Sequence, residues 1–189
     1  MRPLRRDASL ETNPMSQQTT TNKATDSGPV VFRPEALAEY HEILTHYPES
    51  RAALGTVLWL AQREFGWISP AVEQYISELM GLPRAWVEGV VSFYSMYHRR
   101  PVGRSHIQVC TNLSCYLRGA EDIYGAVSKR LDIEAGETTA DGKFSLERVE
   151  CLGSCGTAPM LQLNDQFHEN LTVEQVLDLL GKLERGEKL

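Results

Sequence analysis

The sequence predicts an α+β protein, with a small helical bundle first and a mixed α/β domain after it. Apolar residues recur at helical spacing through about residues 34–91, and beyond residue 104 the pattern changes to strands alternating with helices. The stretch between them, 99–104, holds three arginines, a proline and a glycine, and it predicts a linker. The expected division is a disordered tail over 1–32, a helical bundle over 33–98 and an α/β domain over 104–183.

The expected tail is rich in Thr, Ser, Asn and Gln and has almost no bulky apolar side chains. Such a segment cannot offset its ordering entropy by burial, and this predicts disorder. The basic start, Met1–Arg6, is followed by no apolar stretch, so no secretory signal is predicted. Met15 is an alternative start of the protein.

Four short amphipathic helices are expected in the bundle, because proline and glycine punctuate its helical pattern. Proline fits the first turn of a helix, and glycine fits the residue after its end. The expected starts are Pro34, the residues after Pro48, Ser69-Pro70 and Pro83, and the expected stops are Gly66 and Gly81. Ser69 has the side chain of an N-cap. Such helices predict packing or a docking surface rather than chemistry.

The α/β domain is expected to follow the order strand, helix, strand, hairpin, helix. The expected strands are His106–Val109, Phe144–Val149, Pro159–Leu163 and Gln166–Glu169, with Asn164-Asp165 as the hairpin turn and helices over Tyr116–Leu131 and after Thr172. Thr172 and Gln175 have the spacing of a capping box. This order is that of a thioredoxin-like domain. Such folds often have a cis-proline where Pro159 opens its strand, but a trans bond is the default expectation.

Composition excludes several classes of function. The net charge of −6 disfavours binding to a nucleic-acid backbone, and no apolar run reaches the ~20 residues of a membrane helix. Without a secretory signal the expected compartment is the reducing cytosol. Paired cysteines in that compartment are typical of metal ligands or redox groups rather than structural disulfides.

All four cysteines lie in the stretch 107–165, as two pairs. Cys110 and Cys115 have four residues between them, and Cys151 and Cys155 have three. Each pair follows an expected strand, so the four thiolates should meet at one end of the sheet. Gly153 and Gly156 flank the second pair, where a backbone without side chains lets N–H groups approach sulfur.

Three kinds of site compete for four cysteines at this spacing. A structural zinc usually has two residues between the members of a pair, and a thioredoxin dithiol needs Cys-x-x-Cys; neither spacing is present. An iron–sulfur centre with four cysteine ligands accounts for every cysteine. A Rieske centre is disfavoured, because no histidine follows a cysteine closely. All-thiolate ligation leaves an anionic cluster, and this favours a low reduction potential.

The motifs Cys-Thr-Asn-Leu-Ser-Cys from Cys110, Glu-Cys-Leu-Gly-Ser-Cys from Glu150 and Ala-Pro-Met from Ala158 resemble a known family. It is the thioredoxin-like 2Fe–2S subunit of NADH–quinone oxidoreductase, the respiratory complex I. Upstream, Gly66-Trp67-Ile68-Ser69 and Gly89-Val90-Val91-Ser92-Phe93-Tyr94 are similar to the same family, so the resemblance covers roughly 33–183. Gly156-Thr157 departs from the Val-Asn that complex I members often carry, and this affects tuning rather than ligation.

The resemblance implies one 2Fe–2S cluster held by Cys110, Cys115, Cys151 and Cys155, with no catalytic residue in this chain. It implies a stable heterodimer with a flavin-bearing, NADH-oxidising subunit that binds FMN and NADH, within the larger complex I. It further implies a cytoplasmic protein, peripheral on the inner face of the cell membrane, without insertion or nucleic-acid binding. In that family the cluster lies off the main electron path, and a role in holding an electron from the flavin is proposed.

Two alternatives stay open. The first is the equivalent 2Fe–2S subunit of an NAD-dependent formate dehydrogenase or an NAD-reducing hydrogenase, which use similar modules. The second is a free thioredoxin-like ferredoxin, which the helical bundle disfavours. Arg118 is a candidate for balancing the cluster charge or a solvated side chain. Phe93, Tyr94 and Tyr97 are candidates for a partner contact or for packing between the domains.

Overall fold

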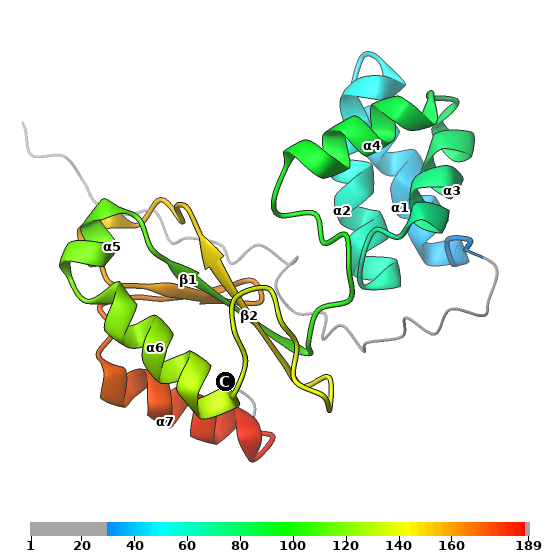
Figure 1. Ribbon diagram of the computed structural model, residues 1–189. Helices are drawn as coiled ribbons and strands as arrows, with labels where there is room; N and C mark the ends of the chain where they lie inside the picture. The colour runs from blue at the N-terminus through cyan, green and yellow to red at the C-terminus, as the bar shows by residue number, and fades with distance from the viewer. Residues whose placement is uncertain (1–29, 188–189) are drawn as a thin grey trace, which may run out of the picture.

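The computed structural model describes residues 30–187 as two lobes, one helical and one α/β (Figure 1). Most of the expected tail over 1–32 lies outside the described residues. Its last residue, Phe32, is part of the helical lobe, where its ring is buried and stacks on Phe65 with 5.6 Å between the ring centroids. The Phe32 N–H donates to the Tyr75 hydroxyl at 3.0 Å. The helical lobe therefore includes chain before its first helix.

The helical lobe contains α1 (Pro34–Thr45), α2 (Leu54–Phe65), α3 (Pro70–Met80) and α4 (Arg84–Phe93), with a 3-10 turn at Ser50–Ala53. Its helix ends have the expected chemistry. Ser69 Oγ accepts a hydrogen bond from the Val72 N–H at 3.2 Å, and Gly66 and Gly81 follow α2 and α3 in left-handed conformations. Buried aliphatic side chains from α1 to α4 form one core.

The α/β lobe contains β1 (Ser105–Cys110), α5 (Leu113–Leu117), α6 (Ala120–Leu131), β2 (Phe144–Val149), β3 (Leu161–Leu163), β4 (Gln166–His168) and α7 (Val173–Glu184). Over the described residues these strands form one sheet in the order β2-β1-β3-β4. β1 and β2 are parallel, and β3 is antiparallel to both of its neighbours. This is the thioredoxin-like order expected from the sequence.

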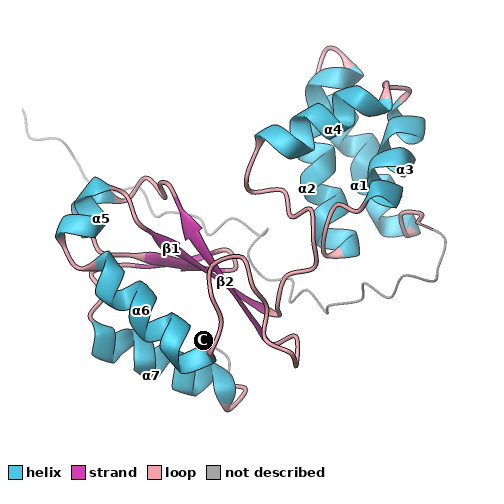
Figure 2. Ribbon diagram, in the orientation of Figure 1, coloured by secondary structure: helices cyan, strands magenta, loops and turns pink. Residues whose placement is uncertain are grey.

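The two faces of the sheet differ in polarity. Ile107 and Leu146 point into the core beneath α6 and α7, which cover one face (Figure 2). Gln108 and Gln162 lie on the other face and line a broad cavity of about 940 Å³, to which Trp59 and Gln62 of α2 also contribute. The alternation of apolar and polar residues along each strand thus decides which face the helices cover.

Several details of the α/β lobe differ from expectation. The helix expected over Tyr116–Leu131 is two helices, α5 and α6, because Gly119 adopts a left-handed φ of 95° between them. The Ala158–Pro159 bond is cis, so the default expectation of a trans bond was wrong. β3 begins at Leu161 rather than at Pro159. Within residues 30–187, no helix has the length and apolarity that crossing a membrane requires.

Candidate metal centre

The two cysteine pairs follow the carboxyl ends of the two parallel strands. Cys110 is the last residue of β1 and is paired in register with Val149, the last residue of β2. The chain beyond both strands stays together, since the Thr111 N–H donates to Val149 O at 3.1 Å. The side-chain amide of Asn112 donates to Glu150 O at 2.6 Å. The structure therefore brings the first cysteine loop against the second, as the strand order predicts.

Cys110 and Cys115 are buried, with 4% and 2% of their surfaces exposed. Asn112 accepts a hydrogen bond from the Leu113 N–H at 2.7 Å as the N-cap of α5, so Cys115 lies within that short helix. Both cysteines belong to a small apolar cluster, separate from the main core, whose other members are Ala120, Ala158 and Met160. Packing in this cluster fixes the first thiol pair.

Cys151 and Cys155 are exposed instead. Gly153 has a left-handed φ of 78°, and its N–H donates to Cys151 Sγ at 3.3 Å. This is one of the two glycine contacts to sulfur that the sequence suggested. Cys155 begins a 3-10 turn, Cys155–Thr157, and Cys151 also lines the broad cavity beside the sheet. The second pair is therefore held by a loop at the surface.

Hydrogen bonds to Glu169, which follows β4, surround the turn that carries Cys155. Thr157 Oγ1 donates to Glu169 Oε1 at 2.5 Å, and Ser154 Oγ donates to the same oxygen. These two hydrogen bonds, the one from Ser154 first, lower the pKa of Glu169, so its carboxyl group is ionised at neutral pH. Sequence reasoning missed Glu169, because it lies in a different segment from the cysteines.

Electrostatic interactions connect three of the thiols. Burial is the main cause that raises the pKa of Cys115 to about 11. A hydrogen bond to Cys110 and the charge of Cys155 raise this pKa further, whereas a backbone hydrogen bond from Met160 lowers it. Such a thiol stays protonated unless a cation compensates its charge. A bound metal supplies that compensation and deprotonates a coordinating thiol outright.

The donor set fits a binuclear iron–sulfur cluster. All four cysteines are free thiols. A lone tetrahedral zinc needs four ligands around one ion, whereas each iron of a 2Fe–2S cluster takes two thiolates. Two thiol pairs on adjoining loops match the second requirement.

The helix after Cys110 exposes an apolar surface that sequence reasoning also missed. Leu113 and Leu117 of α5 are 67% and 72% exposed, and Tyr116 between them is exposed as well. The sequence predicted that Leu117 belongs to one continuous helix over Tyr116–Leu131. The left-handed Gly119 ends α5 early, so this helix does not continue the packing direction of α6. Arg118, at the end of α5, is exposed.

The three aromatic candidates near the linker separate into two roles. Tyr97 is buried in the helical lobe, and its hydroxyl donates to Gly55 O at 2.9 Å. Phe93 and Tyr94 are exposed, with their rings edge to face at 4.9 Å between centroids. Tyr97 is therefore a core residue of the bundle, while Phe93 and Tyr94 remain available for contact.

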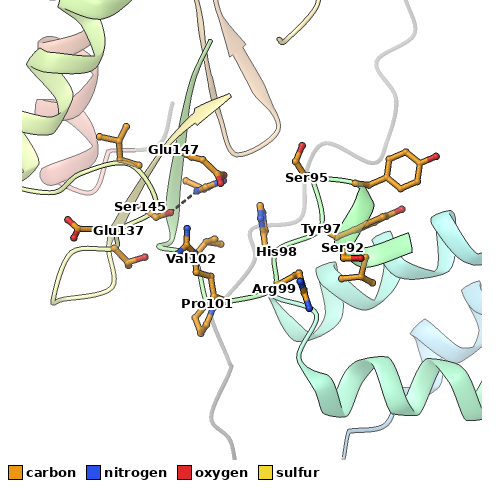
Figure 3. A pocket seen from close by; sticks show the side chains of 17 residues that line it. Ser92, Ser95, Tyr97, His98, Arg99, Pro101, Val102, Glu137, Ser145 and Glu147 are labelled. Atoms are coloured by element: carbon orange, nitrogen blue, oxygen red, sulfur yellow. Dashed lines mark hydrogen bonds and ion pairs between the residues drawn. The ribbon is translucent and has the colours of Figure 1, made fainter. Parts of the chain in front are cut away.

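A histidine joint connects the two lobes, and no motif in the sequence pointed to it. The backbone of His98 belongs to the helical lobe, because the Ile68 N–H donates to His98 O at 2.7 Å. Its ring meets the ring of His106 of β1 edge to face, at 4.7 Å between centroids. His106 Nδ1 lies 2.7 Å from Ser145 Oγ, and Nε2 lies 3.3 Å from Glu147 Oε2. His98 lines a cavity of about 390 Å³ together with Ser145 and Glu147 of β2. Figure 3 shows His98 on one side of this cavity and the two β2 residues on the other.

This joint predicts a pH-dependent stability. Burial, with a smaller contribution from His106, lowers the pKa of His98 to about 4, whereas an exposed histidine in the unfolded chain titrates near 6.5. Between pH 6.5 and about pH 4, the unfolded chain therefore binds a proton at His98 that the folded chain does not bind. The contribution of His98 to the unfolding free energy is fully present above pH 6.5 and is lost as the pH falls toward 4. We expect His98 to account for about 1–2 kcal/mol of lost unfolding free energy between about pH 7 and about pH 5.

Urea unfolding of the apoprotein at both pH values checks this expectation. His98→Phe keeps a ring against His106 but cannot bind a proton. When the pH is lowered from about 7 to about 5, its unfolding free energy should therefore decrease less than that of the parent. His41→Phe, at an exposed position in α1, controls for the loss of one histidine. Equal pH dependence in His98→Phe and in the parent would contradict the prediction.

Comparison with known proteins places this arrangement in context. Residues 40–184 match the model of a family described as thioredoxin-like 2Fe-2S ferredoxin. NADH-quinone oxidoreductase subunit 2 of Thermus thermophilus is 44% identical over 151 residues, covering 78% of this chain and 83% of the relative. An NADH-quinone oxidoreductase subunit of Rhizobium meliloti is 37% identical over 151 residues, covering 80% and 90%. The NADH dehydrogenase flavoprotein 2 of Dictyostelium discoideum is 37% identical over 176 residues, covering 92% and 71%.

Among solved structures, an NAD+-reducing NiFe-hydrogenase in the air-oxidized state is similar, with a TM-score of 0.60 and 19% sequence identity. The match covers 72% of this chain and only 23% of the much longer hydrogenase chain. At this identity the likeness concerns the fold alone. The match includes parts of both lobes, since neither lobe alone makes up 72% of the chain.

Proposed function

Because this chain belongs to the thioredoxin-like 2Fe-2S ferredoxin family, we propose that it is the electron-transfer subunit of an NADH–quinone oxidoreductase. The observation that supports the proposal is the contact between the two loops that carry the free thiol pairs, at the end of the sheet where β1 and β2 finish side by side. The Thermus and Rhizobium relatives, at 44% and 37% identity over most of their lengths, support the choice of complex by their names.

The ligands in this proposal are Cys110, Cys115, Cys151 and Cys155. When bound, a 2Fe–2S cluster accepts and releases single electrons. The chain buries one thiol pair against Ala158 and Met160, keeps the other at the surface and directs the Gly153 N–H at a sulfur. Exposure of sulfur and hydrogen bonds to it are the means by which a protein adjusts a reduction potential.

The partner in this proposal is a flavin-bearing, NADH-oxidising subunit. It would bind NADH and FMN, form a stable heterodimer with this chain and exchange single electrons between FMN and the cluster. The exposed apolar side chains of α5, Leu113, Tyr116 and Leu117, suit a protein contact and lie in the same short helix as Cys115. As part of the larger complex, the chain would lie in the cytoplasm, peripheral on the inner face of the membrane.

The alternatives from the sequence differ in the complex they imply. An NAD-reducing hydrogenase or an NAD-dependent formate dehydrogenase would use a similar module with a flavin partner. The hydrogenase likeness at 19% identity supports a shared fold and does not choose between the complexes. A freely diffusing ferredoxin would have no need for the lobe formed by α1 to α4, which has a buried hydrophobic core of its own.

Anaerobic purification tests this function. We expect about two irons and about two acid-labile sulfides per chain, and an electron paramagnetic resonance signal after one-electron reduction. A flavoprotein should co-purify from the native source, and the cluster should be reduced by NADH only in its presence. Zinc in place of iron would contradict the proposal. So would reduction of an artificial acceptor by NADH with this chain alone.

A further inference from the structure

The loop that carries Cys155 is held in a different way from the buried cysteines Cys110 and Cys115. Cys110 and Cys115 are fixed by apolar packing, whereas Cys155 is exposed and begins a 3-10 turn. The residues on either side of this turn are tied together by hydrogen bonds. The Thr157 N–H donates to Ser154 O at 3.1 Å. Polar contacts of Ser154 and Thr157 therefore hold the turn on which Cys155 lies.

Three side-chain oxygens, from Ser154, Thr157 and Glu169, form hydrogen bonds at this turn. Ser154 directly precedes Cys155, and its Oγ lies 2.7 Å from Thr157 Oγ1. Both hydroxyl groups donate to Oε1 of Glu169, and the distance from Thr157 Oγ1 to this oxygen is 2.5 Å. A carboxylate accepts such hydrogen bonds more strongly than a neutral group does. The charged acceptor therefore joins the two residues that flank the exposed thiol.

We propose that Glu169 is a positioning residue for Cys155, holding the turn Cys155–Thr157 in the conformation that presents this thiol to the cluster. The proposal rests on the ligand set proposed above. Because the carboxylate carries a negative charge beside the loop, it also makes the bound cluster harder to reduce. Glu169 is not one of the proposed ligands, and it acts through Ser154 and Thr157.

The backbone around Glu169 separates this role from a general role in folding. The Asn170 N–H donates to Thr157 O at 2.8 Å, and the Leu171 N–H donates to Pro159 O at 3.0 Å. These hydrogen bonds do not involve the Glu169 side chain, so they persist when it is shortened. Loss of the carboxylate should therefore loosen the turn that carries Cys155 while leaving β3, β4 and α7 in place.

The test compares Glu169→Ala and Glu169→Gln with a matched control, Glu174→Ala. Glu174 is an exposed residue in the first turn of α7, five positions further along the chain. Four quantities are measured on the full chain: the rate of cluster loss to a chelator, the spectrum of the reduced cluster, the midpoint potential of the cluster, and the melting temperature of the apoprotein. We expect cluster loss about two- to tenfold faster in Glu169→Ala, because the hydrogen bonds from Ser154 and Thr157 are lost and water replaces them in part at this exposed position.

The conservative variant separates position from charge. Glu169→Gln keeps an acceptor oxygen, so its rate of cluster loss should lie between those of the parent and of Glu169→Ala. Both variants should shift the midpoint potential upward and alter the spectrum of the reduced cluster, while the apoprotein melting temperature stays that of the parent. Glu174→Ala should match the parent in the rate of cluster loss, in the spectrum of the reduced cluster and in the midpoint potential.

Two results would overturn the positioning role. One is an unchanged rate of cluster loss and an unchanged spectrum in Glu169→Ala. The other is a fall in the apoprotein melting temperature large enough to account for the faster loss, because that is the signature of a purely structural residue. The absence of iron and sulfide from the unaltered protein is a separate result, which refutes the proposed function itself.

Discussion

Replacement of Cys115 or Cys155 by serine is expected to reduce the iron and sulfide content of the purified protein by more than about tenfold, because a neutral hydroxyl is a poor iron ligand. Visible absorption and metal analysis measure this loss directly. The helical lobe should stay folded in both variants, since its core is built from side chains of α1 to α4 and contains none of the cysteines. Far-ultraviolet circular dichroism checks the retained helix.

The same two variants should differ in apoprotein stability. Cys115 is 2% exposed, so a serine there buries a hydroxyl group and costs about 1–3 kcal/mol of unfolding free energy. Cys155 is exposed, and a serine there should leave the apoprotein within about 0.5 kcal/mol of the parent. Full iron content in either variant would remove that cysteine from the proposed ligands.

Gly103→Ala is expected to destabilise the α/β lobe by about 3 kcal/mol. A Cβ atom at Gly103 would lie 2.4 Å from the carbonyl carbon of Phe144 and 2.7 Å from the backbone nitrogen of Ser145. Both contacts are with the backbone of β2, so no side-chain rotation relieves them. The Gly103 N–H also donates to Ser145 Oγ at 3.0 Å, and any shift of the linker weakens this hydrogen bond.

Gly125→Ala is the matched control within the same lobe. Gly125 is exposed in α6, and a Cβ atom there would meet no other atom of the described residues within 4 Å. This change should raise the unfolding free energy by about 0.5–1 kcal/mol, because alanine favours a helix interior over glycine. Urea unfolding of both variants measures the contrast. Equal stability of Gly103→Ala and the parent would contradict the backbone contact.

The sequence was sufficient wherever local chemistry decides the structure. Thr172 and Gln175 form the expected capping box at the start of α7, with Thr172 Oγ1 accepting from the Gln175 N–H at 3.3 Å. Gly66 and Gly81 end α2 and α3 as expected. Parallel pairing of β1 and β2 was enough to predict that the loops following the two strands lie at the same end of the sheet.

Features that depend on tertiary contacts could not be predicted. Apolar spacing alone placed Leu117 in a continuous helix, but the left-handed Gly119 ends α5 and leaves that side chain exposed. His98 and Glu147 are far apart in the sequence, and only the folded structure brings them to the lining of one cavity. Glu169 likewise acquires its role from a segment 12 to 15 residues earlier.

The separate apolar cluster around Cys110 and Cys115 has a consequence for maturation of the protein. Its members pack apart from the main core beneath α6 and α7, so the sheet does not depend on the cofactor for its burial. Folding can therefore precede insertion of iron and sulfide, unlike in small zinc domains that are unfolded without their metal. An assembly factor would then meet a finished scaffold, with Cys151 and Cys155 accessible for the first step of delivery.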